Sequence, residues 1–350
     1  MCPMTPAQRI FTTIGQKEPD RVPLLLTLTH HGAKELGLSI KDYYSQANNV
    51  VEGQVRLQKK YGHDAFYPFF HGPLEYEAWG GEVIFSEDGP PNTGEPLLPA
   101  SAPISALRVP EVQHSPGLLR ALEAMAGMKA VAKDEIPVLG VVMSPFSLPV
   151  VQLGFDRYMD LLLGDREAFW RLMEINIPFC QAWSNAQLDA GATLIAYFDP
   201  LASPTMIPAE LYRETGHVAA KTCFAGVKGP TAIHLGSGRT LGVIDELVET
   251  GTLIVGTSSE EDLDLVKAKA AGRITVLGNL NGIAMASWSA AEAEEHVKSI
   301  IAKAGRGGGF ILGDTHGEIP WQVTDEVLMA IADAVRAWGT YPLDRAPVHA

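Results

Sequence analysis

Eight short apolar or β-branched segments recur along the 350-residue chain, and they constrain its fold more than any other feature. Each is a few residues long, is bounded by glycine, proline or aspartate, and is separated from the next by sequence compatible with a helix. Strands that alternate with helices predict parallel β-structure with helical crossovers. The eight segments are residues 22–28, 65–70, 137–143, 193–198, 231–235, 252–255, 274–277 and 310–312.

Polar side chains follow these segments, which favours a single (β/α)8 TIM barrel. In such a barrel the functional side chains lie at the carboxyl ends of the strands. An open Rossmann-like sheet is the alternative, but no Gly-x-Gly-x-x-Gly motif follows an early strand. The polar residues at the segment ends are His30, His31, His71, Ser144, Asp199, His234, Ser258, Asn279, Asn281, Asp314 and His316.

Helix signals and one irregular interval define the organisation of the chain. Ser258 with Glu261, and Ser289 with Glu292, fit the capping-box pattern that starts a helix. Residues 290–304 then carry apolar side chains at helical spacing. Residues 85–114 are proline-rich and aperiodic, which indicates an insertion after the second strand. We therefore expect one domain over residues 1–350, with an N-terminal helical extension and this insertion.

Charge and composition exclude several classes of function. The chain has 41 acidic and 27 basic residues and a net charge of −14, which argues against a nucleic-acid or anionic-membrane surface. No apolar run approaches the roughly 20 residues that span a bilayer, and no signal peptide is evident. The three cysteines show no paired spacing. We expect a cytoplasmic protein.

His234 and His316 are the leading catalytic candidates, because each follows an apolar run and lies among glycines. Histidine is the commonest metal ligand and the side chain that titrates near neutral pH, so the pair indicates a metal or an acid/base site. Either ring could instead bond a neighbouring carbonyl and serve only the fold. Asp199 is the third candidate: it orients a ligand, completes a metal site, or simply caps the next turn.

A second group of side chains is predicted to bind substrate. Alternation along a strand lets only one of two adjacent side chains face inward, which applies to His30 and His31. Of Tyr197 and Asp199, we expect at most one to face the cavity. The asparagines are also typical turn formers. An aromatic run at 66–70, comprising Phe66, Tyr67, Phe69 and Phe70, suits either a bound ring or core packing. The predicted substrate-binding residues are His30, His31, His71, Tyr197 and Asn279.

Seven motifs, taken in order, give the chain a resemblance to the uroporphyrinogen decarboxylase superfamily, which includes zinc-dependent corrinoid methyltransferases. They cover most of the chain, from about residue 4 to residue 340. The motifs are residues 5–10 (TPAQRI), 20–23 (DRVP), 75–80 (EYEAWG), 198–203 (FDPLAS), 233–236 (IHLG), 277–280 (LGNL) and 308–320 (GGFILGDTHGEIP).

Departures from the family pattern narrow the expected chemistry. The decarboxylases carry an arginine-bearing segment after the first strand and an aspartate after the second, whereas here residues 24–37 lack arginine and His71 takes the aspartate position. The thiol methyltransferases hold zinc with His-x-Cys and a distal Cys. His234 matches that histidine, but Gly236 and His316 stand at the cysteine positions. The resemblance thus implies zinc held by His234 and His316 and completed by an oxygen ligand, for which Glu75, Asp199 and Asp314 are candidates.

A zinc site of imidazole and carboxylate would be more electrophilic than one rich in thiolate. The leading hypothesis is therefore a methyltransferase that moves a methyl group from a methoxylated, aromatic donor to the Co(I) corrinoid of a partner protein. The alternatives are methylcorrinoid-to-acceptor transfer, a decarboxylase, and a non-catalytic binding protein. The implied cofactors are zinc and a partner-borne corrinoid. The implied partners are a corrinoid protein, a small methyl donor and a second copy of the chain.

Overall fold

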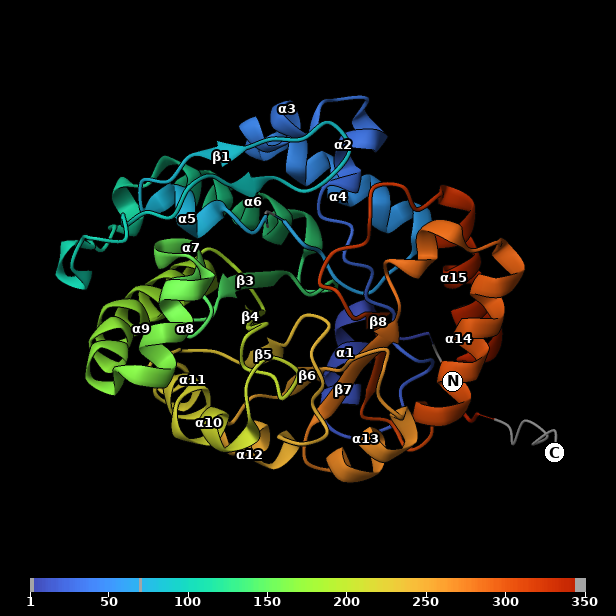
Figure 1. The fold of residues 1–350 in the computed structure, drawn as a ribbon. Coiled ribbons are helices and arrows are strands. Elements are labelled where there is room, and N and C mark those ends of the chain that lie inside the picture. The colour runs from blue at the N-terminus through green and yellow to red at the C-terminus, as the bar shows by residue number, and fades with distance from the viewer. Residues whose placement is uncertain (1–2, 69–70, 344–350) are drawn as a thin grey trace.

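The computed structural model describes residues 3–68 and 71–343, and it has six parallel strands in one sheet. The strands lie side by side in chain order, and helices surround them (Figure 1). This arrangement confirms the predicted α/β barrel class. The strands are β3 (Leu139–Met143), β4 (Leu194–Phe198), β5 (Thr231–His234), β6 (Ile254–Gly256), β7 (Thr275–Leu280) and β8 (Phe310–Asp314).

The first two predicted strands close the barrel without forming regular strands. Leu24 makes a single parallel bridge to Leu312 of β8, and Phe66 makes one to Val138 beside β3. Between these two segments, the main-chain N–H of Leu24 donates to the carboxylate of Asp64 at 2.8 Å. The Asp64 side chain therefore takes the place of a main-chain hydrogen bond between the two segments. The prediction that these segments form regular strands is wrong. Phe69 and Phe70 of the second segment lie outside the described residues.

Helices follow the strands around the outside of the barrel (Figure 1). The insertion at 85–114 contains β2 of a short antiparallel pair, β1 (Val83–Ile84) with β2 (Asn92–Thr93), and two 3-10 turns at Ile104–Ala106 and Val112–His114. The helices are α1 (Pro6–Ile14), α2 (His31–Leu36), α3 (Ile40–Ser45), α4 (Ala47–Tyr61), α5 (Leu74–Ala78), α6 (Pro116–Ala132), α7 (Pro149–Leu153), α8 (Phe155–Gly164), α9 (Arg166–Asp189), α10 (Ala209–Glu214), α11 (Gly216–Phe224), α12 (Ile244–Glu249), α13 (Leu263–Ala270), α14 (Ala290–Ala304) and α15 (Asp325–Trp338).

One predicted capping box is confirmed and the other is wrong. Ser289 and Glu292 form the reciprocal pair at the start of α14. Helix α13 instead begins at Leu263 under the cap of Asp262. The carboxylate of Glu261 is engaged elsewhere, because it accepts hydrogen bonds from the main-chain N–H groups of Thr240 and Leu241. It thereby joins the loops that follow β5 and β6.

The amino-terminal face of the barrel is held by a buried charge network. Arg9 of α1 contacts Asp20 and Asp64, each at 2.6 Å, and Arg21 contacts the other oxygen of Asp64 at 2.8 Å. Asp64 is fully buried. Because four charges from three segments satisfy one another, the network fixes α1 beneath the barrel and sets the position of the first two segments.

Apolar packing occurs in distinct layers. The largest cluster lies between the sheet and the surrounding helices, whereas a smaller one lines the inside of the barrel. The inner cluster consists of Ile10, Leu25, Ala65, Tyr67, Leu139, Leu194, Ala232, Ile254 and Ile311. Within residues 3–68 and 71–343, no helix has the length and apolar character to cross a membrane.

Candidate functional site

His234 ends β5 at the carboxyl-terminal face of the barrel, beside Phe198 of β4. Its Nδ1 accepts a hydrogen bond from the N–H of Gly236 at 3.1 Å, and the ring also bonds the main chain of Asp314. Because Nδ1 accepts, the proton lies on Nε2, and both nitrogens are engaged. Burial lowers the pKa of His234, although the charge of Asp314 opposes that shift. His234 is therefore a neutral ring at pH 7.

His316 follows β8, and one nitrogen of its ring has no hydrogen-bond partner among the described residues. Its Nδ1 accepts from the N–H of Gly282 at 3.2 Å and lies 3.2 Å from the hydroxyl of Thr315. The proton is therefore assigned to Nε2, and no group in the described part of the chain accepts a hydrogen bond from it. Burial lowers the pKa of His316, with Asp314 opposing. A half-buried, neutral His316 thus offers an N–H donor.

Asp314 and Gly317 bring the two histidines together. One carboxylate oxygen of Asp314 accepts from the N–H of His316 at 3.1 Å and from that of Gly317 at 2.9 Å. Gly317 has a φ of +85°, and a Cβ there would lie 3.1 Å from the Phe198 ring and 3.8 Å from Cε1 of His234. Glycine is required because the turn passes directly over these rings. His234 and His316 therefore lie close enough to interact electrostatically.

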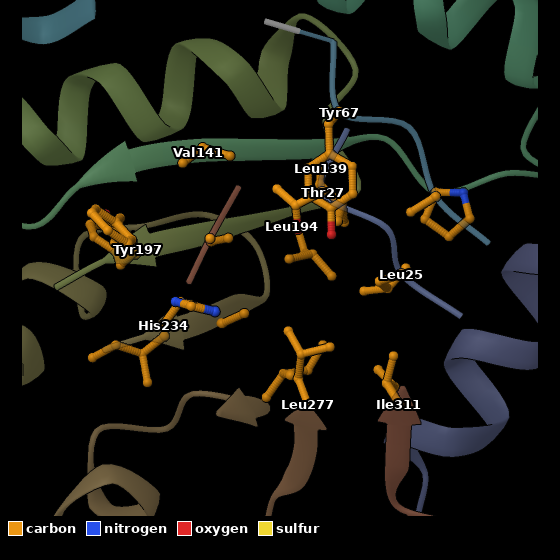
Figure 2. Close-up of a pocket in the computed structure, with 18 of the residues that line it drawn as sticks. Leu25, Thr27, Tyr67, Leu139, Val141, Leu194, Tyr197, His234, Leu277 and Ile311 are labelled. Atoms are coloured by element: carbon orange, nitrogen blue, oxygen red, sulfur yellow. The ribbon is translucent and has the colours of Figure 1, made fainter. Parts of the chain in front are cut away.

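An apolar cavity of about 70 Å³ lies inside the barrel, and His234 contributes to its wall. Figure 2 shows side chains from several strands pointing into this shared space, with His234 at one side. Gly317 borders the cavity as well, so the loop after β8 reaches both the histidine pair and the interior. The lining residues include Ile10, Leu25, Thr27, Ala65, Tyr67, Leu139, Leu194, Ala196, Phe198, Ala232, Ile254, Leu277 and Ile311.

Two of the predicted substrate-binding histidines lie in a separate cluster after the first barrel segment. Nδ1 of His30 and the hydroxyl of Thr29 both contact the carboxylate of Glu318. Burial raises the pKa of Glu318, and the His30 contact opposes the shift. Nε2 of His31 contacts the carbonyl oxygen of Ile319 at 3.1 Å. The structure thus ties both histidines to the segment that follows His316.

The other predicted substrate-binding residues have different surroundings. The ring of His71 lies 4.9 Å from that of Tyr44. The hydroxyl of Tyr197 lies 2.6 Å from Oγ of Ser184 in α9 and so faces the helices, although Tyr197 also contributes to the cavity wall. The side-chain amide of Asn279 donates to the carbonyl of Ser258 at 3.0 Å. Substrate binding by these side chains stays a prediction.

Asp199 and Glu75 are buried carboxyl groups, and their hydrogen bonds connect them to groups other than the histidine rings. Asp199 accepts from the hydroxyl of Ser147 at 2.6 Å, and burial raises its pKa to about 6. Glu75 accepts from the N–H of Met143 at 3.0 Å, and burial raises its pKa to about 7. The catalytic role predicted for Asp199 is untested by these contacts.

The predicted zinc site does not fit the described residues. Within residues 3–68 and 71–343, no group of three or more His, Cys, Asp or Glu side chains could hold a metal ion. A histidine that binds zinc must offer a ring-nitrogen lone pair, yet Nδ1 of His234 and Nδ1 of His316 each accept a main-chain N–H. His234, His316 and Glu75 are therefore not gathered as a metal centre.

Asp314 is the site residue that sequence reasoning valued least, although it stood among the strand-end residues. Its place at the carboxyl end of an apolar run was the available signal. Its role in joining the two histidines could not be read from that signal, because it depends on the turn that the loop makes after β8.

Comparisons with known proteins agree with this fold. Residues 5–338 match the family Uroporphyrinogen decarboxylase (URO-D). Methylcobamide:CoM methyltransferase MtaA of Methanosarcina barkeri (strain Fusaro) is 24% identical over 298 residues, covering 80% of this chain and 84% of that protein. Uroporphyrinogen decarboxylase of Idiomarina loihiensis is 23% identical over 358 residues, covering 94% and 95%. A solved methyltransferase from Methanosarcina mazei has a TM-score of 0.84 at 17% identity, covering 95% of this chain and 99% of that chain.

Proposed function

Because the chain belongs to the uroporphyrinogen decarboxylase family, whose members similar to it include a methylcobamide methyltransferase, we propose that it is a corrinoid-linked methyltransferase. Its reaction moves a methyl group from a methoxylated donor to the Co(I) corrinoid carried by a partner protein. The sequence motifs support the corrinoid branch of the family, and the donor and the direction of transfer are part of this proposal.

The observation that carries the proposal is the N–H donor of His316 beside His234 and the cavity. In the transfer, the electron pair of Co(I) attacks the methyl carbon, a cobalt–carbon bond forms, and the carbon–oxygen bond breaks with its pair moving to oxygen. Nε2–H of His316 donates a hydrogen bond to that oxygen as its charge develops. Solvent then supplies the proton that completes the alcohol product.

Asp314 and Gly282 position His316 for this role. The main-chain N–H of Gly282 holds Nδ1 as an acceptor, which keeps the proton on Nε2. The carboxylate of Asp314 holds the His316 main chain. Since the described residues do not fit a zinc ion, no step of the proposed reaction passes through a metal held by this chain.

The cavity wall favours methyl transfer over decarboxylation of a substrate with many carboxylates. Such a substrate would need lysine or arginine side chains around it. Among the described residues that line the cavity there is neither, and the wall is mainly aliphatic. The decarboxylase alternative therefore lacks the cations that its substrate would require at this place.

A single-turnover assay tests the proposal. Purified protein is mixed with cob(I)alamin and a set of methoxylated compounds, aromatic ones included, and the cobalt spectrum is followed. We expect methyl-Co(III) to form with at least one donor and His316→Phe to slow its formation. The direction is wrong if methyl-Co(III) forms with no donor but is consumed in the presence of a thiol or another acceptor.

A further inference from the structure

We propose that the axial cavity binds the non-reacting part of the substrate, and that this part is a short, uncharged aliphatic chain. The inference rests on the proposed function and names the substrate class for that site. It concerns the interior of the barrel, below the histidine pair, where ordinary packing would leave no room for a ligand.

The cavity exists because small side chains occupy interior positions. The inside of a (β/α)8 barrel is normally filled by layers of bulky branched side chains. Here Ala196 and Ala232 line the interior from the adjacent strands β4 and β5, and Ala65 lines it from the second barrel segment. Larger aliphatic residues, such as Leu139 and Leu194, stand beside them. The void therefore follows from side-chain volume.

The solvent exposure of three residues in the middle of strands identifies the same cavity. Val141, Ala196 and Leu277 lie in the middle of β3, β4 and β7, with helices outside them, yet each keeps partly accessible surface. The residues on either side of Val141 and of Leu277 are buried. Because all three residues line the cavity, their accessible surface faces inward. This surface is available to a small ligand.

The chemistry of the wall selects an uncharged, apolar occupant. No charged side chain lines the cavity among the described residues, and the polar side chains there are few. Tyr67 bonds Thr27, and burial raises the pKa of Tyr67, so its hydroxyl stays protonated at neutral pH. An apolar pocket with a few convergent polar groups is the usual form of a small-molecule site. An ion would lose its hydration there without replacement.

The size of the cavity limits the chain to a few atoms. A cavity of roughly 150 Å³ admits benzene, and one water needs at least about 10–15 Å³. At about 70 Å³, this cavity lies between those limits and suits about three or four carbon atoms. A propyl chain would fit, with the oxygen near His234 and His316 and the methyl group directed outward, toward the face from which cobalt must approach. A phenyl ring would not fit.

Xenon tests the cavity without reference to methyl transfer. Crystals of the full chain are pressurised with xenon, and anomalous density is sought between Ala196, Ala232 and Leu277. Density there supports an accessible apolar chamber. Its absence overturns the inference, whatever the outcome of the single-turnover assay. This separates failure of the cavity proposal from failure of the proposed function.

Ligand-observed NMR then tests the substrate class. We expect the wild-type protein to bind 1-methoxypropane more tightly than anisole. Ala232→Val, which adds two methyl groups to the cavity, should weaken the binding of 1-methoxypropane at least tenfold. Ala196→Val provides the same test from β4 should the first variant not fold. Val142→Ile adds one carbon on the helix-facing side of β3 and is the matched control, expected to bind as the wild type does.

Two results of the binding experiment would overturn the inference. One is equal or tighter binding of anisole, and the other is unchanged binding of 1-methoxypropane in both alanine variants. If 1-methoxypropane binds as expected but no donor yields methyl-Co(III), the cavity assignment stands and the proposed direction of transfer fails.

Discussion

The two ends of the barrel differ in how their buried carboxylates are bonded. At the amino-terminal face, Arg9 and Asp64 are bonded to partners on both sides. At the carboxyl-terminal face, several buried polar atoms have no hydrogen-bond partner among the described residues. They include Oδ1 of Asp314 and Nε2 of His30.

The difference separates stability from function within one fold. A buried polar group without a partner costs free energy, so a cluster of such groups lowers stability unless a ligand satisfies them. In a TIM barrel the amino-terminal face serves stability and the carboxyl-terminal face carries the active site. We therefore expect substitutions at the first face to change unfolding, and substitutions at the second to change binding and rate.

The largest expected effect is at the amino-terminal face. Asp64→Asn leaves Arg9 and Arg21 without their shared buried partner, and breaking a buried pair in this way costs about 3–5 kcal/mol. Guanidinium unfolding measures the loss. Asp333→Asn is the control, because its pair with Arg336 is largely exposed and such pairs contribute about 0–1 kcal/mol. Equal losses in the two variants would remove the contrast between a structural and a functional face.

At the opposite face, His316→Phe should slow methyl-Co(III) formation by about 10²–10³-fold, the usual cost of removing one preorganised donor to a developing oxyanion. Its unfolding midpoint should stay near that of the wild type. His316→Gln, which keeps an N–H donor, should recover part of the rate. A large fall in unfolding midpoint with an unchanged rate would place His316 with the structural residues.

The pH dependence of stability extends the comparison of the two faces to Glu75. Burial raises its folded-state pKa to about 7, above the unfolded value of about 4.3. The folded state therefore binds the proton more tightly, and this stabilisation is present at low pH and is lost as pH rises from about 4 to 7. Glu75→Gln should reduce that fall in the free energy of unfolding by on the order of 2 kcal/mol. Urea unfolding between pH 5 and 8 measures it, and parallel curves for both proteins would contradict the assignment.

The smallest expected effect comes from filling the cavity. An empty cavity costs about 24 cal/mol per Å³, so Ala232→Val should raise the free energy of unfolding by roughly 1 kcal/mol while it weakens ligand binding. Urea unfolding measures the gain. A loss of stability would mean that the wall cannot accept two more methyl groups, and that the interior is more tightly packed than its accessible surface indicates.

Local patterns were sufficient where local physics decides the structure. The capping pair Ser289 and Glu292 and the helical spacing after it gave α14 with the bounds expected from the sequence. The apolar runs from 137 onward became strands of one parallel sheet. Polar residues at the ends of those runs directed attention to His234 and His316, which the structure brings near each other, because a barrel collects the carboxyl ends of its strands on one face.

Elsewhere, contacts between distant segments overrode the local pattern. Glu261 looked like a helix cap, but its carboxylate bonds the loop at Thr240 and Leu241. The run at 22–28 looked like a strand, but Asp64 takes the N–H of Leu24. In each case a hydrogen bond between segments distant in sequence replaces the expected local one, and no window of neighbouring residues contains that information.

The sequence by itself determined the barrel and the family, and it made the two histidines the leading candidates, because these follow from periodicity, motif order and strand-end polarity. Only the tertiary structure decided which nitrogen of each histidine carries the proton, since Gly236 and Gly282 supply the bonds that fix it. It also decided that Ala65, together with Ala196 and Ala232, which lie side by side on β4 and β5, lines an open interior. The sequence around an alanine in a strand does not show whether a side chain across the barrel fills the space beside it or leaves that space empty.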